Sequence, residues 1–348
     1  MGASRQGRAV SPPPEPAALS TALRSWLARR FGGQVHDADP PGIATGGYDY
    51  STYLLAFRGT ELPPDWIAPL VARVPSDPRR HPMLEREARL QGWCAQQGYP
   101  APKVLAVLGP GETVDLPVEI MQRVPGVTMA ASMLSAPWRT PRLVDRLAAM
   151  QASLHTLPIP PWADQAAPDW SVAERRLHLV RHVLSLAPDP ALAGGLARVE
   201  PLLPRLAHSA PAVCHGDLHP ENILVAGPDA HAIDWTDAGI GDRHADVSRT
   251  ALLFRVAAVV APRPIERAAT KLTAPVLARR FLSAYRRRLP VDPARLDLWT
   301  PLHLLHFWAA ASANESGLLG STATGDRYPL GLGDWMRRQF EWAMSVVR

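Results

Sequence analysis

The sequence predicts an α+β fold with two lobes, and two observations support this. Up to about residue 122, strand-like segments alternate with one clear helix; the rest contains long amphipathic patterns with only short strand candidates between them. We therefore expect a small antiparallel β-sheet N-lobe with one helix and a larger, mostly helical C-lobe. The expected boundaries are a disordered segment at 1–16, an N-lobe at 17–124 and a C-lobe at 125–348.

The expected N-lobe elements follow from periodicity and from turn residues. Residues 1–16 are rich in proline and small polar residues, which is typical of disorder. Leucines at helical spacing predict a helix at 17–31, which ends at two glycines, and a second helix is expected at 81–98. Apolar runs bounded by turn residues predict strands at 50–57, 68–74, 103–109 and 116–122.

The C-lobe patterns have the period of helices. Amphipathic segments predict helices at 141–156, 170–187, 190–207, 244–260, 265–288, 300–317 and 332–347. Short strand candidates lie at 211–214, 222–226 and 231–235. The pair Thr300-Pro301 predicts a helix start, because a capping hydroxyl precedes a proline in the first turn.

Composition limits the classes of function. Of the 348 residues, 47 % are hydrophobic and 20 % charged, which is ordinary for a soluble globular protein. The net charge of +5 is compatible with an anionic ligand such as a nucleotide. The longest block of like charge is "RRR" at 286–288, so we expect no nucleic-acid partner.

Cysteine usage and apolar runs indicate the compartment. Two cysteines, Cys94 and Cys214, cannot form a disulfide framework and suggest a reducing environment. The N-terminus has no stretch that could serve as a signal peptide, and the longest apolar run, at 251–261, is short and interrupted by Arg255. We expect a cytoplasmic protein with no membrane partner.

The segment "HGDLHPENIL" at 215–224 places two histidines, two carboxylates and an asparagine within ten positions. It could be a hydrogen-bonded loop without chemistry, or a zinc site made of His215, Asp217 and His219. It could also be a phosphoryl-transfer loop. In that case Asp217 accepts the proton of an attacking hydroxyl, and Asn222 offers an amide oxygen to magnesium.

The downstream segment "HAIDWTDAGIGDRHAD" at 231–246 favours phosphoryl transfer. A short apolar strand delivers Asp234 to a turn, where it can present a second metal-binding carboxylate. Zinc would require further His or Cys ligands, whereas this region supplies hard oxygen ligands, which suit magnesium.

Together, these two segments resemble the aminoglycoside phosphotransferase and choline kinase-like family, which shares its fold with protein kinases. The resemblance covers the chain from about residue 20 to the end. It implies that Asp217 is the catalytic base and that Asn222 and Asp234 bind the metal. It further implies that Asp246 supports the catalytic loop and that His215 packs beneath it. Mg²⁺ is then the cofactor, and ATP or GTP the co-substrate.

The N-lobe resembles the same family through looser motifs. "GGYDYSTYLLAF" at 46–57 is similar to the strand–turn–strand over the nucleotide phosphates, and "VEIMQRVPG" at 118–126 to the connector that holds adenine. Without the other motifs, the Gly-Gly turn would indicate only a hairpin. Glu87 would likewise be interpreted as a surface charge on an amphipathic helix. The resemblance implies these nucleotide-binding residues: Gly46, Gly47, Ser51, Arg73, Glu87, Met121, Gln122 and Val124.

Arg73 departs from the family pattern, which has a phosphate-binding lysine at this position. Neither lysine of the chain, Lys103 or Lys271, can replace it by motif. An arginine keeps the charge and can grip phosphate oxygens bidentately, but it is longer and planar. We therefore expect Arg73 to contact phosphate and to pair with Glu87 in a different geometry.

The acceptor is less well defined by the sequence. Residues 262–348 contain 13 Lys and Arg against 7 Asp and Glu, which argues weakly against a polycationic acceptor. Aromatic-rich segments at 302–317 and 328–342 could line an apolar acceptor site or simply pack in the core. Glu315 and Asp334 are the acidic candidates nearest such a site.

These observations predict a kinase that transfers a phosphoryl group from ATP or GTP to a hydroxyl of a small molecule. The alternative is a pseudokinase-like protein that binds nucleotide or a partner without turnover. The expected partners are a nucleotide and a small hydroxyl-bearing substrate, and the sequence does not define an oligomeric state.

Overall fold

A computed structural model of the chain describes residues 12–44, 50–163, 171–206, 209–260, 264–318 and 331–347. The chain divides into two compact units: residues up to Ala95 with Ala101–Val124, and Gln96–Pro100 with Pro125–Arg348. Residues 1–11 of the predicted disordered segment lie outside the described residues, as do Gly46 and Gly47.

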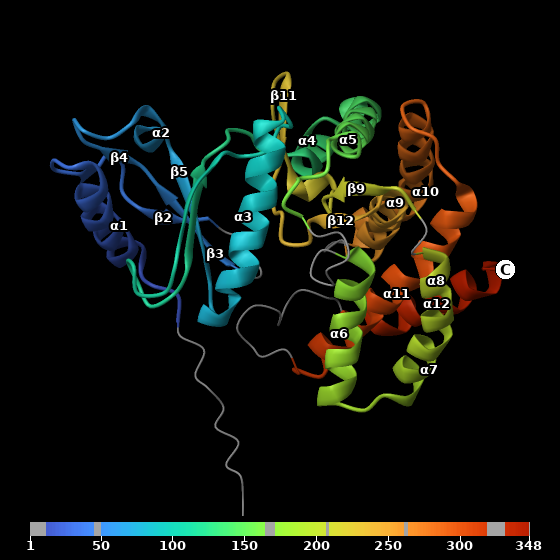
Figure 1. The fold of residues 1–348 in the computed structure, drawn as a ribbon. Coiled ribbons are helices and arrows are strands. Elements are labelled where there is room, and N and C mark those ends of the chain that lie inside the picture. Colours follow the sequence, from blue (N-terminus) through green and yellow to red (C-terminus); the bar gives the residue numbers. More distant parts are fainter. Residues whose placement is uncertain are drawn as a thin grey trace, which may run out of the picture. The chain divides into compact units, whose positions relative to one another are not determined.

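The first unit contains a five-stranded antiparallel sheet in the order β2-β3-β5-β7-β6 (Figure 1). Strands β1 and β4 form a separate two-stranded antiparallel sheet. The elements are α1 (Pro16–Phe31), β1 (His36–Asp37), β2 (Gly42–Ile43), β3 (Tyr50–Leu55), β4 (Phe57–Arg58), α2 (Pro64–Ile67), β5 (Leu70–Pro75), α3 (His81–Gln96), β6 (Val104–Leu108) and β7 (Val118–Gln122).

The two faces of this sheet differ in chemistry, because successive strand residues point to opposite sides. One face is apolar and packs on the leucines of α1, and it includes Ala72, Val74, Val118 and Ile120. The other face bears Arg73, Glu119 and Met121, and α3 covers it (Figure 1). A charged arginine and a glutamate are therefore buried between a sheet and a helix.

The second unit is mostly helical, with short strand pairs. Its elements are β8 (Val127–Thr128), α4 (Met129–Ser135), α5 (Thr140–Leu154), α6 (Val172–Leu186), α7 (Pro190–Val199), α8 (Leu203–Leu206), β9 (Pro211–Cys214), β10 (Ile223–Ala226), β11 (Asp229–Ala232), β12 (Gly239–Asp242), α9 (Arg243–Val260), α10 (Pro264–Arg286), α11 (Pro293–Glu315) and α12 (Leu332–Val346). Among the described residues, no helix combines the length and hydropathy that a transmembrane span needs.

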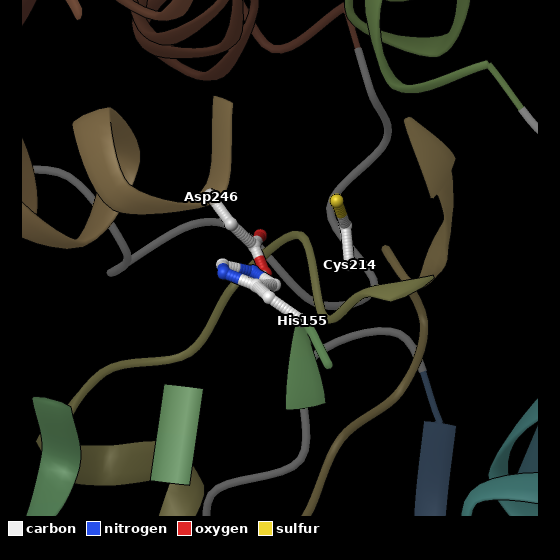
Figure 2. A group of neighbouring side chains, drawn as sticks. All are labelled: His155, Cys214 and Asp246. Carbon is white, nitrogen blue, oxygen red and sulfur yellow. The ribbon is translucent and has the colours of Figure 1, made fainter. Parts of the chain in front are cut away.

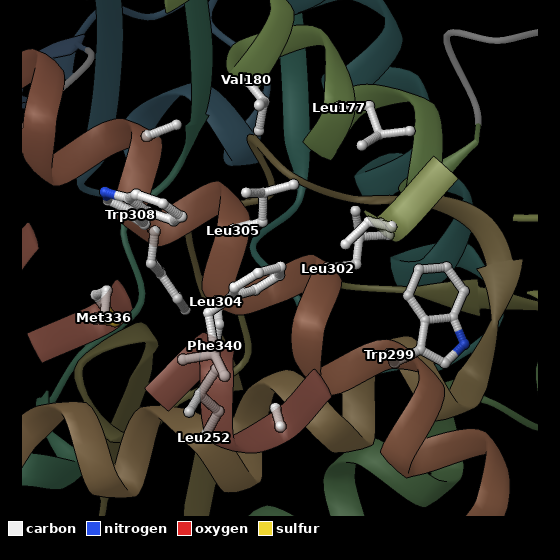
Figure 3. Packing of buried hydrophobic residues seen from close by; sticks show 14 of the residues in the cluster. Leu177, Val180, Leu252, Trp299, Leu302, Leu304, Leu305, Trp308, Met336 and Phe340 are labelled. Atoms are coloured by element: carbon white, nitrogen blue, oxygen red, sulfur yellow. The ribbon is translucent and has the colours of Figure 1, made fainter. Parts of the chain in front are cut away.

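Helix α11 lies in the centre of the second unit's core. It packs against α6, α7, α9 and α12. Most of its side chains, among them Leu302, Leu305 and Trp308, are nearly or completely buried, and they pack with Val180 and Phe340 (Figure 3). A helix that is apolar on all sides is expected at such a position.

The predicted α+β class, with a small antiparallel sheet followed by a mostly helical part, is confirmed. The predicted helix start at Thr300-Pro301 is wrong. Helix α11 begins at Pro293, where the Asp292 carboxylate accepts a 2.9 Å hydrogen bond from Ala294 N. Pro301 lies inside the helix, and Thr300 Oγ1 donates to Leu296 O at 2.8 Å. The chain offers two Xaa-Pro starts, and the earlier one begins the helix.

Candidate functional site

The loop between β9 and β10 contains Asp217, whose carboxylate is held by helix α9. Arg249 Nε and Nη2 lie 2.9 and 2.7 Å from Asp217 Oδ1. The other oxygen, Oδ2, lies 3.4 Å from His219 Nε2 and 3.3 Å from Asn222 Nδ2. The Asp217 side chain is 25 % exposed and that of Arg249 only 6 %. The arginine thus fixes one carboxylate oxygen, and a partly exposed carboxylate remains for a hydroxyl donor.

A network of charges keeps this carboxylate ionised. Burial alone would raise the pKa of Asp217, but the charges of Arg249 and His219 outweigh it and lower the pKa well below its usual range. Arg249 Nη2 also lies 3.5 Å from Asp237 Oδ2, and Arg176 Nη1 lies 2.7 Å from the same atom. Asp217 is therefore a carboxylate at neutral pH, which suits it to accept a hydrogen bond and then a proton from a hydroxyl.

The hairpin of β10 and β11 places Asn222 beside Asp234. Ile223 pairs with Ala232, and Ile233 N donates to Asn222 O at 2.9 Å. The Asn222 amide nitrogen donates to Asp217 O at 3.0 Å, which directs the amide oxygen elsewhere. An amide oxygen and a carboxylate on adjacent strand ends are hard ligands that fit a divalent cation such as Mg²⁺.

Asp234 has an unusual backbone conformation. Its φ is 61°, the one positive φ of a non-glycine residue in the part of the chain that the structure describes. Asp tolerates this left-handed region better than most residues, although at a cost, and such residues cluster at functional sites. The exposed carboxylate accepts a 2.7 Å hydrogen bond from Thr236 Oγ1. The turn therefore presents the Asp234 carboxylate at the surface of the unit.

Asp246 at the start of α9 holds the backbone of the Asp217 loop. Its carboxylate accepts hydrogen bonds from His215 N at 2.8 Å and Gly216 N at 2.6 Å. Gly216 has φ 79°, and a Cβ there would lie 2.1 Å from Asp237 O, so only glycine fits. Burial opposes ionisation, but hydrogen bonds and charge from His155 lower the pKa of Asp246.

His155, Cys214 and Asp246 form a buried group, and their potential ligand atoms all lie within 4.8 Å of one another (Figure 2). These atoms are already engaged. His155 Nε2 donates to Asp246 Oδ2 at 3.2 Å, and His155 Nδ1 lies 2.7 Å from Tyr285 Oη. The Cys214 thiol donates to Ala212 O at 3.6 Å, and burial raises its pKa well above the usual value. The group supports the loop through hydrogen bonds rather than binding metal.

His215 connects the Asp217 loop to the segment that carries Asp234. Its Nε2 donates to Ile233 O at 3.1 Å, and its ring lies 4.9 Å from that of Trp235. Because the side chain is fully buried, its pKa is lowered. The neutral, packed imidazole therefore supports the site, because it links the backbone at residues 215 and 233.

In the first unit, Arg73 lies between two glutamates. Its Nη1 is 3.0 Å from Glu119 Oε2 and 3.8 Å from Glu87 Oε2. Tyr50 Oη donates to both Glu87 oxygens at 3.2 and 3.1 Å, and its ring centroid lies 4.0 Å from Arg73 Cζ. Arg73 is 8 % exposed, Glu87 1 % and Glu119 fully buried, so a nearly buried arginine is packed against two buried carboxylates.

The other predicted nucleotide-binding residues of this unit occupy different places. Met121 lies on the Arg73 face, where Gln91 Nε2 approaches its sulfur at 3.7 Å. Gln122 uses its backbone N–H within the unit, donating to Lys103 O at 2.9 Å, and Val124 is the unit's last residue. Ser51 and Tyr53 are two residues apart on β3, so their side chains lie on the same face of the sheet, opposite to that of Arg73.

The aromatic-rich segments expected near the acceptor are mostly core. Phe307, Trp308 and Phe340 are 6 % exposed or less, whereas Trp342 is 56 % exposed. Glu315 Oε1 accepts hydrogen bonds from Gly331 N at 3.2 Å and Gly333 N at 3.4 Å, so it caps the start of α12. Asp334 is exposed in the first turn of α12. Residues 319–330 lie outside the described residues.

Sequence reasoning missed the ionic partners of the site. Arg249 follows Asp246 by three residues, so both lie on one face of α9, and this spacing could have indicated it. Glu119 is a charged residue in an otherwise apolar strand segment, another usable signal. Arg176 had no local signal, because it reaches Asp237 and Gly216 O from a distant helix.

The sheet with one helix on its polar face and the acidic loop of the helical unit are features of protein-kinase-like phosphotransferases. The chain belongs to the phosphotransferase enzyme family (APH), whose family model matches residues 43–299. It is 28 % identical over 238 residues to an aminoglycoside 3'-phosphotransferase of Streptomyces fradiae, covering 65 % of this chain and 81 % of that protein.

Solved structures share the fold at low identity. Choline kinase LicA from Streptococcus pneumoniae superposes with a TM-score of 0.58 at 13 % identity, covering 93 % of this chain and 98 % of that one. A thermostable mutant of aminoglycoside phosphotransferase APH(4)-Ia in complex with ADP and hygromycin B gives a TM-score of 0.56 at 14 % identity, with the same coverage. The protein-kinase-like fold class is thereby confirmed.

Proposed function

We propose that this protein is a magnesium-dependent kinase that transfers the γ-phosphoryl group of ATP or GTP to a hydroxyl of a small molecule. The observation that supports this best is the Asp217 carboxylate, ionised and fixed by Arg249, beside the amide of Asn222. Membership of the phosphotransferase family and nucleotide-bound structures of the same fold support it further. In this proposal, residues 17–124 bind nucleotide and residues 125–348 hold the catalytic loop and acceptor.

The residues act mainly by position and charge, because phosphoryl transfer has a loose transition state with little covalent work for the protein. Asp217 accepts a hydrogen bond from the acceptor hydroxyl, aligns its oxygen, and takes the proton as the bond to phosphorus forms. Its lowered pKa makes it a weak base, so orientation contributes more than proton abstraction. When bound, Mg²⁺ neutralises charge on the phosphate oxygens, and Asn222 and Asp234 would hold it.

Arg73 takes the phosphate-binding role in this proposal, and Glu87 belongs to the same charge cluster. The pair of Cys94 and Cys214, both free and buried, supports a cytoplasmic location. The acceptor is proposed to be neutral or weakly charged, because residues 262–348 have an excess of positive charge. The buried aromatic residues of α11 give this choice no support.

The requirement for magnesium tests the kinase against a nucleotide-binding protein without turnover. We expect ATP to raise the melting temperature in the presence of Mg²⁺, with a gain of about 2.7 kcal/mol in free energy of unfolding at 100 times Kd. Excess EDTA should remove most of this gain. Full stabilisation by ATP in excess EDTA would favour the protein without turnover.

An ATP-consumption screen tests the acceptor class. Aminoglycosides, macrolides, sugars, amino alcohols and nucleosides should be compared at equal concentration, with Asp217→Asn as the matched inactive control. We expect turnover with a neutral or weakly charged hydroxyl compound. Turnover of polycationic aminoglycosides alone would overturn the acceptor assignment and leave the kinase assignment standing.

A further inference from the structure

The cluster on the polar face of the first unit contains a carboxylate that the nucleotide-binding pattern of the sequence does not include. Glu119 lies directly across from Arg73 in the register of β7 and β5. The Arg73 Nη1–Glu119 Oε2 distance is 3.0 Å, a direct charge-assisted hydrogen bond. The expected partner, Glu87, is 3.8 Å from the same nitrogen, beyond hydrogen-bonding distance.

The two glutamates are fixed in different ways. Glu119 is on a central strand with neighbours on both sides, β5 and β6, so its position relative to Arg73 is set by the ladder. Glu87 is on α3, and its two oxygens receive the Tyr50 hydroxyl at 3.2 and 3.1 Å. Tyr50 also lies beneath the guanidinium, with Cζ 4.0 Å from the ring centroid. The strand carboxylate therefore makes a direct hydrogen bond to Arg73 from a position that the strand ladder fixes.

Donor geometry links Glu119 to the choice of arginine. Glu119 is fully buried, and an isolated buried carboxylate costs several kcal/mol unless a cation is paired with it. A planar guanidinium has five N–H donors in a fork, so it can serve two carboxylates and still direct N–H groups to a third anion. A lysine ammonium is a compact point charge on a flexible stem, which suits one carboxylate and one phosphate. A second cation also lies near this cluster, because Arg80 Cζ is 5.7 Å from the centroid of the Tyr50 ring.

We propose that Glu119 is a positioning residue matched to Arg73, which holds the guanidinium in the orientation needed to contact nucleotide phosphate. The inference rests on the proposed function, in which Arg73 binds phosphate. In this arrangement arginine replaces lysine only because Glu119 is present. Lysine at position 73 would carry the same charge but lack the planar fork of N–H donors that can reach both carboxylates and phosphate.

The test is a double-variant cycle on the full-length chain with Arg73→Lys, Glu119→Gln and the combination of both. Dissociation constants are measured for MgATP and for adenosine, which has no phosphate. Each single change should weaken MgATP binding roughly 10-fold or more. The double variant restores a pairing of one lysine with one glutamate, so it should bind MgATP more tightly than Arg73→Lys alone, by roughly 10-fold.

Adenosine separates positioning from a structural defect. We expect its affinity to change less than 2-fold in all three variants, whereas a distorted sheet would weaken both ligands. Glu112→Gln is the matched control, since it makes the same chemical change in a loop where the carboxylate accepts from Gly109 N. It should leave both dissociation constants unchanged.

Additive losses in the double variant, or equal losses of adenosine and MgATP affinity, would overturn the pairing of Glu119 with Arg73. If Arg73→Lys alone kept wild-type MgATP affinity, the matching would also be refuted. A wild type that binds neither MgATP nor MgGTP would instead overturn the proposed function, and this inference with it.

Discussion

Each of the two units places an arginine between two carboxylates, but the charges are arranged in opposite ways. In the first unit, Arg73 lies between Glu119 and Glu87, both of which are nearly or fully buried. In the second, Arg249 lies between Asp217 and Asp237, whose side chains are 25 % and 32 % exposed while the arginine is 6 % exposed. The first arrangement fixes a cation with buried anions, and the second fixes partly exposed anions with a buried cation.

The difference shows which group each unit is built to present. In an ion pair, the more buried charge fixes the orientation of its partner, because solvent screens a buried charge least. In the first unit the glutamates orient Arg73, and an oriented cation suits recognition of an anion. In the second unit Arg249 orients Asp217, and an oriented carboxylate suits contact with a hydroxyl.

The largest effect is expected when the presented anion is changed. Asp217→Asn removes the proton acceptor while keeping nearly the same shape, so turnover should fall by about 10²–10⁴-fold. Binding of MgATP should stay within about 2-fold, because Asp217 is not assigned to the nucleotide. Steady-state kinetics and calorimetry measure the two quantities. Turnover at the wild-type rate would contradict the assignment of Asp217 as base.

A smaller effect is expected when the supporting cation is changed. Arg249→Met removes both hydrogen bonds to Asp217 Oδ1 and leaves Asp217 and Asp237 without the guanidinium that separates them. The loss of orientation should lower kcat by about 10–100-fold, with little change in the KM for ATP. The free energy of unfolding should fall by about 3–5 kcal/mol, since a buried pair is broken.

Arg295→Met is the control for this loss of stability. Arg295 lies on α11 rather than on α9 and pairs with the buried Asp242 at 2.8 and 2.6 Å. Below the melting temperatures of both variants, it should lower kcat much less than Arg249→Met. Equal losses of kcat would mean that Arg249 acts only through stability.

The corresponding change in the first unit is Arg73→Ala. It removes the proposed phosphate contact, so MgATP binding should weaken by roughly 1.5–3 kcal/mol, with kcat less affected at saturating nucleotide. Arg79→Ala is a suitable control, because Arg79 is an exposed arginine that pairs with Asp77. An unchanged MgATP affinity in Arg73→Ala would remove Arg73 from the nucleotide site.

Local parts of the site could be predicted from the sequence because their geometry is local. Asp217 and Asn222 are five residues apart on one loop, and Asp234 follows a short apolar strand that returns beside it. A fixed spacing and a single hairpin are enough to bring these atoms together. The same holds for most helices and strands, whose periodicity depends on a few turns of chain.

The sequence marks Arg249 and Glu119 as candidates, but which residues they pair with could not be predicted, because the pairing depends on register and on helix packing. Glu119 reaches Arg73 across 46 positions, through a strand pairing that a shift of one residue would turn to the other face. Arg249 reaches Asp217 across 32 positions from a helix whose rotation is set by the core. The start of α11 at Pro293 instead of Thr300 shows a competition between two capping sites, which sequence rules do not rank.

The smallest expected effect is a loss of stability in mild acid, caused by two histidines of α11, the buried His303 and the half-buried His306. Burial and nearby arginines lower the pKa of His306 to about 3 and that of His303 well below its usual value. Their unfolded-state pKa is about 6.5, so their stability contribution is present above pH 6.5 and is lost as the pH falls from there toward the folded value.

The lowered pKa values of Asp242 and Asp246 act only below about pH 4, so these carboxylates do not change the free energy of unfolding between pH 7 and 5. The full shift of His306 would correspond to about 2 kcal/mol between pH 7 and 5, and the half-buried position of its ring reduces this to about 1 kcal/mol. His306→Gln should therefore reduce the pH 7-to-5 decrease in free energy of unfolding by about 1 kcal/mol, measured by urea denaturation. His178→Gln, at an exposed position of α6, should leave that decrease unchanged. An equal pH dependence in wild type and His306→Gln would mean that His306 does not couple folding to protonation, and that the acid sensitivity of the second unit arises elsewhere.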